Sequence, residues 1–349
     1  MPPNFVSSDR TRETSQAEIR KVMAVRFGRL GDVLLLLPAL AALKMQLPGT
    51  IIVLVTDHRY ADIAELSPYV DEVVPVNRLA MRDGPKLNAI SAMLRLVMPL
   101  RAMNFDLALD FHGFCETQLL VWLSGSRFRC GLKRRAKLFL PFCFNRPAIV
   151  EDKTIHVREM FLRIVAAAAD AKDCGHSAKL LVPPPAITSK ISELLPRGPL
   201  VAFYVGARVG DHVWPAARFA SLADLVVEQL AASVVLLGGN SPAEVNVPTQ
   251  IRTLCGHRKK VFVLENLQIG DMVAVMSSCN ILVSNDSGPM HIGPAVGVPT
   301  LGLFSISSPQ HYCPSGPGDK VLWAQDVTTI PVEVVFSSVQ QMWGSPTPR

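Results

Sequence analysis

The chain has 349 residues, of which 49% are hydrophobic and 18% are charged, and its formal net charge is +6 at pH 7. This composition excludes an intrinsically disordered protein, and the length suits two domains of ordinary size. The seven cysteines are widely spaced and form no Cys-x-x-Cys motif, which argues against a disulfide framework or a zinc site and favours the cytoplasm. Asn4–Lys21 does not resemble a secretory signal, and the longest apolar stretch, Val33–Leu43, is too short to span a bilayer.

The positive charge lies in the first half of the chain. Residues 1–183 carry 25 Lys and Arg against 18 Asp and Glu, a net of +7, whereas residues 184–349 carry 10 against 11, a net of −1. This asymmetry indicates that the first half meets an anionic partner, although net charge that serves only solubility is the alternative.

Strands alternate with helices in the first half of the chain. We expect residues 1–20 to be a flexible lead, and a turn at 28–32. The predicted strands are 21–27, 51–56, 72–76 and 107–111, and the predicted helices are 33–45, a stretch ending at 66, 87–103 and 157–170. This alternation predicts an α/β fold with a parallel sheet covered by helices.

A run of three prolines, Val182–Ala186, interrupts this pattern and is typical of a stiff extended spacer. We therefore predict one domain over 21–182 and a second over 183–349, facing a central cleft. The second domain is expected to have strands at 200–204, 233–237, 261–264, 281–284 and 318–324, and helices at 216–229, 269–277 and 331–342. We leave open whether the last helix packs back on the first domain.

Residues 281–304 carry the most informative pattern, a buried strand, a polar turn, a short helix and a second strand. Pro289 suits the start of the helix, and Gly297 suits the residue after its end. Four polar groups converge at this helix N-terminus: Asp286, Ser287, the Gly288 backbone and His291. Such a terminus favours a phosphate. The alternative is that Asp286 or Ser287 only caps the helix and His291 packs against the turn.

A second motif, Arg26–Asp32, runs from a strand into a helix through two glycines. It is neither a dinucleotide-binding Gly-x-Gly-x-x-Gly motif nor a P-loop. Asp32 at the helix start could take a proton from an attacking hydroxyl. Alternatively, this carboxylate only interacts with the helix dipole.

Two further loops follow strands in the second half of the chain. Gly206–Phe219 supplies Arg208 and His212 before a helix, where cations suit a diphosphate, while Trp214 and Phe219 are predicted core anchors. Gly238–Glu244 places Glu244 where a carboxylate could bind ribose hydroxyls, although a surface role is the alternative.

A basic run, Arg127–Phe142, combines six cations with aromatic and aliphatic residues. It suits an interfacial segment for anionic lipid or a phosphorylated acceptor. Nucleic acid is disfavoured because no recognised nucleic-acid motif accompanies the run, and a solvated charged face is the alternative.

These segments together resemble glycosyltransferase family 9, the bacterial heptosyltransferases of lipopolysaccharide core assembly. The matching pieces are 26–38, 206–219, 238–244 and 285–291. The resemblance implies a GT-B fold of two Rossmann-like domains, with the acceptor bound by the first and the nucleotide-sugar by the second. It also implies an inverting transfer without a cofactor or essential metal, and work at the inner face of the cytoplasmic membrane.

Carried over by position, the resemblance makes Asp32 the general base. The implied donor-binding residues are Arg208, His212, Glu244, Asp286, Ser287, Gly288, Pro289 and His291. The implied acceptor-binding residues are Arg26, Arg29, Gly31, Lys133, Arg134 and Arg135. The expected donor is ADP-heptose, the expected acceptor is an anionic glycolipid, and the expected location is cytoplasmic with peripheral membrane contact and no nucleic acid.

Two departures from the family pattern bear on the donor site. His212 and Val213 stand where many relatives carry a phosphate-binding lysine, and Gly28 stands where many have Asp or Ser. The alternatives are an inactive nucleotide-sugar-binding protein, or a GT-B sugar-nucleotide epimerase or hydrolase. Neither Ser287 nor Glu244 distinguishes ADP from GDP or UDP donors.

Overall fold

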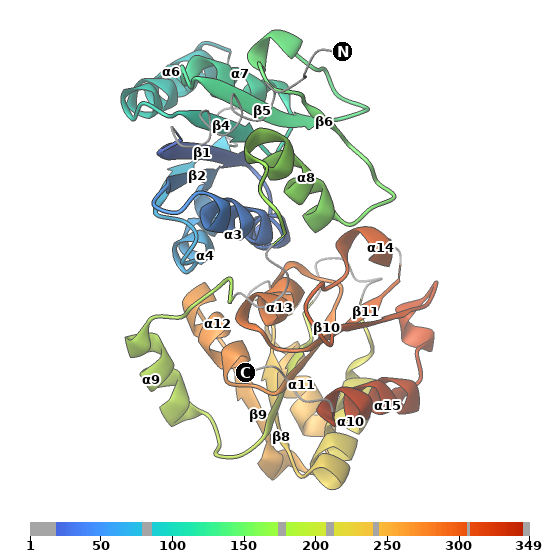
Figure 1. The fold of residues 1–349 in the computed structure, drawn as a ribbon. Helices are drawn as coiled ribbons and strands as arrows, with labels where there is room; N and C mark the ends of the chain where they lie inside the picture. Colours follow the sequence, from blue (N-terminus) through green and yellow to red (C-terminus); the bar gives the residue numbers. More distant parts are fainter. Residues whose placement is uncertain are drawn as a thin grey trace, which may run out of the picture. The chain divides into compact units, whose positions relative to one another are not determined.

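The computed structural model describes residues 19–78, 86–173, 179–206, 213–239, 244–305 and 308–344. Contacts between residues divide the chain into two compact units, Met1–Gly175 and His176–Arg349, shortly before the predicted boundary at residue 182. Each unit contains one six-stranded parallel sheet with helices on both faces (Figure 1). The predicted α/β class is therefore confirmed, while the cleft between the domains stays a prediction.

The sheet of unit 1 has the strand order β3-β2-β1-β4-β5-β6. Its strands are β1 (Lys21–Arg26), β2 (Ile51–Asp57), β3 (Glu72–Val76), β4 (Leu107–Asp110), β5 (Phe128–Lys133) and β6 (Ile149–Val150). Its helices are α2 (Leu30–Leu34), α3 (Leu37–Gln46), η1 (His58–Tyr60), α4 (Ala61–Glu65), α6 (Lys86–Ala102), α7 (Cys115–Leu123), η2 (Pro141–Cys143) and α8 (Val157–Ala169). Helices α3 and α8 contact each other on one face of the sheet, and α6 and α7 cover the other face (Figure 1).

Unit 1 departs from the sequence prediction in two places. The predicted helix 33–45 is two helices, α2 and α3, because Pro38 lacks an amide hydrogen and is accommodated in the first turn of a new helix. Helix α7 and strand β5 were not predicted. Strand β5 lies within the basic run, where the cations obscure the apolar pattern. In the structure, Cys130, Gly131 and Leu132 are buried.

The sheet of unit 2 has the order β12-β11-β10-β7-β8-β9. Its strands are β7 (Leu200–Tyr204), β8 (Ser233–Leu237), β9 (Val261–Leu264), β10 (Ile281–Asn285), β11 (Thr300–Phe304) and β12 (Lys320–Trp323). Its helices are α9 (Pro185–Leu194), α10 (Ala216–Leu230), α11 (Val247–Leu254), η4 (Arg258–Lys260), α12 (Ile269–Ser277), η5 (Gly288–His291), α13 (Ile292–Val296), α14 (Pro309–Tyr312), η6 (Val327–Thr329) and α15 (Val332–Trp343). Helices α10, α11 and α15 share the core on one face, and α9 packs against α12.

In unit 2 the main difference from the sequence prediction is at the three prolines, which were expected to form an extended spacer. Pro184 is extended and Pro185 begins helix α9, because a proline at the first helical position loses no intrahelical hydrogen bond. Helix α11 was also not predicted. The last helix, α15, contacts α10, and its buried side chains belong to the core of unit 2.

The strand order places one topological switch point in each sheet. In unit 1 the chain runs from β1 outward to β3 and then returns to β4, so the loops after β1 and β4 diverge. In unit 2 the loops after β7 and β10 diverge in the same way. Open α/β sheets bind ligands at such points, outside the carboxyl ends of the strands. None of the helices in the described parts of the chain is both long and apolar enough to cross a membrane.

Candidate active site

Asp32 lies in the first turn of α2, just after the loop that follows β1. Its carboxylate accepts hydrogen bonds from the Arg26 guanidinium and, at 2.9 Å, from the Arg29 backbone N–H. Burial raises the pKa of Asp32, but the Arg26 charge and these hydrogen bonds outweigh it and hold the pKa below its ordinary value. The side chain is 25% exposed, so an ionised carboxylate faces outward at the switch point. A Cβ on Gly28 would overlap it, which explains the glycine there.

Arg26, the last residue of β1, holds this carboxylate in place. It is buried, its Nη1 donates to the Phe111 carbonyl oxygen at 2.7 Å, and its guanidinium carbon lies 5.0 Å from the centroid of the Phe161 ring. Its Nε is buried and has no hydrogen-bond partner among the described residues. These contacts make Arg26 a positioning residue for Asp32, and its predicted acceptor contact stays a prediction.

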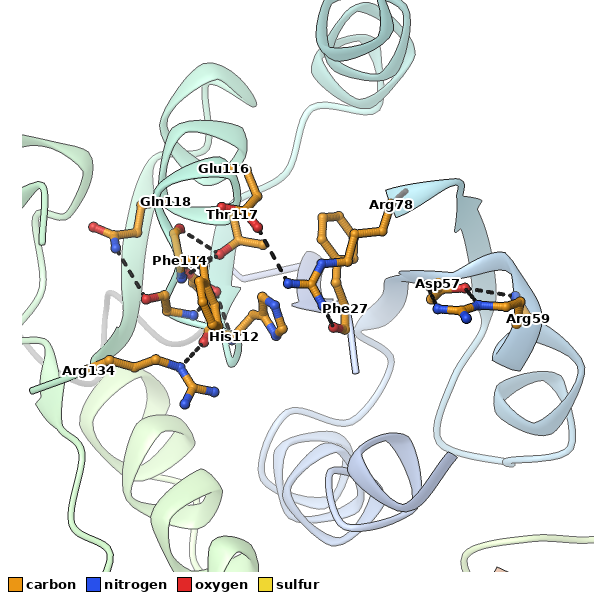
Figure 2. A network of polar contacts seen from close by, with 12 residues as sticks. Phe27, Asp57, Arg59, Arg78, His112, Phe114, Glu116, Thr117, Gln118 and Arg134 are labelled. Atoms are coloured by element: carbon orange, nitrogen blue, oxygen red, sulfur yellow. Dashed lines mark hydrogen bonds and ion pairs between the residues drawn. The ribbon is translucent and has the colours of Figure 1, made fainter. Parts of the chain in front are cut away.

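His112 lies in the loop after β4 and was not predicted from the sequence. The buried Asp110 carboxylate shapes this loop by accepting hydrogen bonds from the backbone N–H groups of His112 and Gly113, at 2.8 and 2.9 Å. Figure 2 shows the imidazole between Phe114 and Phe27, whose ring centroids lie 4.6 and 6.0 Å away. An Asp-x-His-Gly sequence directly after a buried strand was the signal that could have found it.

The His112 ring is buried, and neither ring nitrogen has a hydrogen-bond partner within the described part of the chain. Burial, together with the charges of Arg26, Arg78 and Arg134, lowers the pKa of His112 to about 2. The imidazole is therefore neutral at physiological pH. It offers one donor and one acceptor in surroundings that are otherwise rich in donors.

Arg78 approaches the His112 loop from the end of β3 (Figure 2). Its Nη1 donates to the Phe27 carbonyl oxygen at 3.2 Å, and its Nη2 lies 3.7 Å from Glu116 Oε1. The buried Arg78 Nε, like that of Arg26, has no partner among the described residues. Arg78 was also not predicted from the sequence, because it lies outside the basic run, well before it in the chain.

Arg134 approaches from the end of β5. Its Nε donates to the His112 carbonyl oxygen at 2.6 Å, and its Nη1 donates to Glu151 Oε1 at 2.9 Å. Its guanidinium carbon lies 4.9 Å from the Phe114 ring centroid, and its charge contributes to the lowered pKa of Asp32. Of the predicted acceptor residues, Arg134 and Arg26 thus belong to the same charged cluster as Asp32.

The other predicted acceptor residues lie around this cluster. Gly31 is in the first turn of α2, and Arg29 is the exposed residue that precedes the helix. Lys133 is exposed and lies 5.2 Å above the Phe139 ring, while Arg135 donates to the Glu151 carbonyl oxygen at 3.0 Å. Their roles stay predictions.

At the switch point of unit 2, a buried asparagine joins the loops that follow β7 and β10. Asn285 ends β10, its Nδ2 donates to the Val205 carbonyl oxygen at 2.8 Å, and its Oδ1 accepts from the Trp214 backbone N–H at 3.0 Å. Trp214 and Phe219 are both buried with ring centroids 4.9 Å apart, which confirms them as core anchors. Sequence reasoning placed Asn285 in the turn and missed its structural role.

The predicted phosphate-binding turn follows Asn285. Asp286 and Ser287 lead into the 3₁₀ turn η5, in which Pro289 lies in the first turn and His291 is buried at the end. Ser287 holds the N-cap position, but its side chain makes no capping hydrogen bond. The predicted helix is therefore divided into the 3₁₀ turn η5 and helix α13, which ends before Gly297, whose φ of 79° matches the expected helix end.

Glu244 lies against the glycine loops that follow β7 and β8. A Cβ on Gly206 would come within 2.7 Å of Glu244 Oε1, and a Cβ on Gly239 would come closer still to Glu244 Oε2. The sheet order puts Glu244 and the turn after β10 at the carboxyl ends of β8, β7 and β10, three adjacent strands. The remaining predicted donor residues, Arg208 and His212, lie outside the described residues.

Two Rossmann-like sheets, each with polar groups at its switch point, make up a GT-B fold. The family model described as "Glycosyltransferase family 9 (heptosyltransferase)" matches residues 93–335, more than half of the chain, and the chain belongs to this family. The predicted family, fold and enzyme class are confirmed.

Relatives and solved structures agree with this assignment. The chain is 27% identical over 301 residues to lipopolysaccharide heptosyltransferase 1 of Pseudomonas aeruginosa, covering 83% of this chain and 79% of that protein. The structure of a family 9 glycosyl transferase from Veillonella parvula is similar, with a TM-score of 0.79, 24% identity, and coverage of 93% of this chain and 97% of that chain. E. coli ADP-heptose LPS heptosyltransferase II has a TM-score of 0.75 at 20% identity, with coverage of 93% and 98%.

Proposed function

We propose that this enzyme transfers a heptose or related sugar from a nucleotide-diphosphate donor, expected to be ADP-heptose, to an anionic lipopolysaccharide core acceptor. The observation that carries this proposal is the ionised Asp32 carboxylate, partly exposed and surrounded by arginines at the switch point of unit 1. The curated relative in Pseudomonas aeruginosa is a lipopolysaccharide heptosyltransferase, and the similar E. coli structure is named for ADP-heptose. Both names support the choice of donor and acceptor.

In the proposed mechanism, Asp32 accepts the proton of an acceptor hydroxyl as that oxygen attacks the anomeric carbon of the donor. The attack comes from the face opposite the diphosphate, so the bond to the diphosphate breaks and the anomeric configuration is inverted. A carboxylate fixed by Arg26 and the Arg29 N–H is already oriented for this step. No metal ion takes part in this scheme.

Acceptor recognition is assigned to the arginines and to His112. Arg78 and Arg134 carry charge that suits a carboxylate or phosphate of the acceptor. The unpaired nitrogens of the neutral His112 ring suit a sugar hydroxyl, which both donates and accepts a hydrogen bond. The side chains that position the base and those that recognise the acceptor thus come from adjacent loops.

Donor binding is assigned to unit 2. Backbone groups of Ser287 and Gly288, in the turn after β10, would face the diphosphate, whereas the Asp286 N–H already donates to the Leu303 carbonyl oxygen at 3.0 Å. Glu244 would bind ribose hydroxyls. Charge that develops on the diphosphate would be stabilised there by these groups together with Arg208 and His212.

The test combines nucleotide binding with turnover. The purified protein is heated with ADP, GDP, UDP and their sugar conjugates, and the most stabilising conjugate is then assayed with and without a lipid A–core acceptor. Preferential stabilisation by ADP-heptose, with ADP release that depends on the acceptor, is the expected result. Stabilisation without turnover would indicate a binding protein, and release without acceptor would indicate a hydrolase or epimerase. Either outcome would refute the proposed transfer.

A further inference from the structure

An exposed apolar cluster lies beside the acceptor site of unit 1, and the enzyme chemistry does not use it. We define this apolar patch as Trp122 on α7, Leu138 in the following loop, and Phe142 in η2. Their exposed fractions are 44%, 66% and 57%. Large side chains exposed together in this way mark an interaction surface more often than scattered ones do.

A ring contact and two backbone hydrogen bonds order this part of the surface. The Trp122 and Phe142 rings meet edge to face with centroids 5.6 Å apart. The buried Gln118, one turn before Trp122 on α7, donates to the Leu138 carbonyl oxygen at 3.0 Å and accepts from the Leu140 N–H at 2.7 Å. Helix α7 and Gln118 appear in Figure 2 beside the His112 loop. The patch is therefore a fixed part of the domain surface.

The segment that carries the patch is rich in cations. Between residues 117 and 150 the sequence contains seven Lys and Arg and no Asp or Glu. Four of these cations are exposed: Arg127, Lys133, Arg135 and Lys137. An exposed tryptophan and phenylalanine within a cationic surface match the boundary of a membrane that carries anionic headgroups, where aromatic rings enter the interface and cations meet the lipid charge.

We infer that the apolar patch and its flanking cations dock unit 1 onto an anionic lipid surface. This inference rests on the proposed function, whose acceptor is a glycolipid, and names a surface for the peripheral membrane contact expected from the sequence. Its test needs neither donor nor acceptor. A failed lipid test therefore leaves the glycosyl transfer untouched, and a failed turnover test leaves the lipid surface untouched.

The experiment is co-sedimentation of the full chain with vesicles of phosphatidylglycerol and phosphatidylcholine, and with phosphatidylcholine vesicles alone. Wild type should bind the anionic vesicles, and binding should weaken as salt screens the charges. The variant L138S/F142S should bind at least about tenfold more weakly, since each side chain loses part of its transfer free energy. Leu254→Ser, at a residue of unit 2 that is 57% exposed, is the matched control and should bind like wild type.

Charge and insertion are tested separately. Lys137→Ser should weaken anionic vesicle binding by about fivefold, as expected for one cation near a charged surface, whereas Lys259→Ser in unit 2 should not. A blue shift of tryptophan fluorescence on vesicle addition should disappear in Trp122→Phe. Unchanged thermal midpoints must accompany these results.

Equal vesicle binding by wild type and L138S/F142S would overturn the inference. A second result would also overturn it: wild type does not bind the vesicles but forms a dimer, and L138S/F142S abolishes the dimer. That result would reassign the patch to contacts between copies of the chain.

Discussion

The two units share a topology but present different chemistry at their switch points. In unit 1 the loops after β1 and β4 carry long charged side chains and a buried imidazole, with Asp32 held by Arg26 and His112 surrounded by arginines. In unit 2 the loops after β7 and β10 are joined by one small amide, Asn285, and the proposed donor site uses backbone groups of the adjacent turn. Unit 1 is therefore suited to recognition and proton transfer by side chains, and unit 2 to anion binding by the backbone.

This difference predicts opposite responses to mutation. Side-chain changes at the site of unit 1 should impair turnover while the fold persists, because Asp32 is partly exposed and lies in the first turn of a helix. Changes at Asn285 should impair folding, because its amide provides hydrogen bonds to two buried backbone groups that would otherwise have no partner.

The largest expected effect is that of Asp32→Asn. Amide substitution keeps the shape of the side chain but removes the proton acceptor, so kcat should fall by about 10²–10⁴-fold, the usual contribution of a general base. The measurement is acceptor-dependent release of the nucleoside diphosphate at saturating donor. Asp62→Asn, at an exposed position in the first turn of α4, is the matched control and should keep wild-type turnover. Near-normal kcat in Asp32→Asn with intact folding would refute the base assignment.

The second prediction concerns Asn285→Ala. Removing the amide leaves the Val205 carbonyl and the Trp214 N–H without their partner in a buried environment, which should cost about 2–4 kcal/mol of unfolding free energy. Urea unfolding measures this loss. Asn280→Ala is the control, because Asn280 is exposed and its side chain accepts a hydrogen bond from the Leu200 N–H at 3.0 Å. If both variants lost the same small amount, Asn285 would not organise the switch point.

Sequence alone predicted the alternation of strands and helices well, because buried apolar runs such as 200–204 and 233–237 are read directly from hydrophobicity. It failed where local signals conflicted, as at Pro38 and Pro185, which begin helices and do not simply interrupt structure. Asp32 and Glu244 were predicted as site residues because each follows a glycine-rich loop after a strand, and their roles stay predictions. Arg78 and His112 were missed because their proximity depends on the order β3-β2-β1-β4, which no local pattern specifies.

The smallest expected effect is the pH dependence of the wild-type rate between pH 5 and 8. The pKa of Asp32 is lowered in the folded protein, so its carboxylate is ionised throughout this range, and its stabilising contacts are lost only as the pH falls through that lowered pKa. The neutral His112, with a pKa of about 2, does not titrate in this range either. The profile of kcat/KM should therefore show no acid limb from these two groups.

A limb with its midpoint near 6 would point instead to Asp110. Burial raises the pKa of Asp110 to about 6, and its carboxylate shapes the His112 loop. In that case the loop, and not the proton acceptor, would set the pH response of the acceptor site.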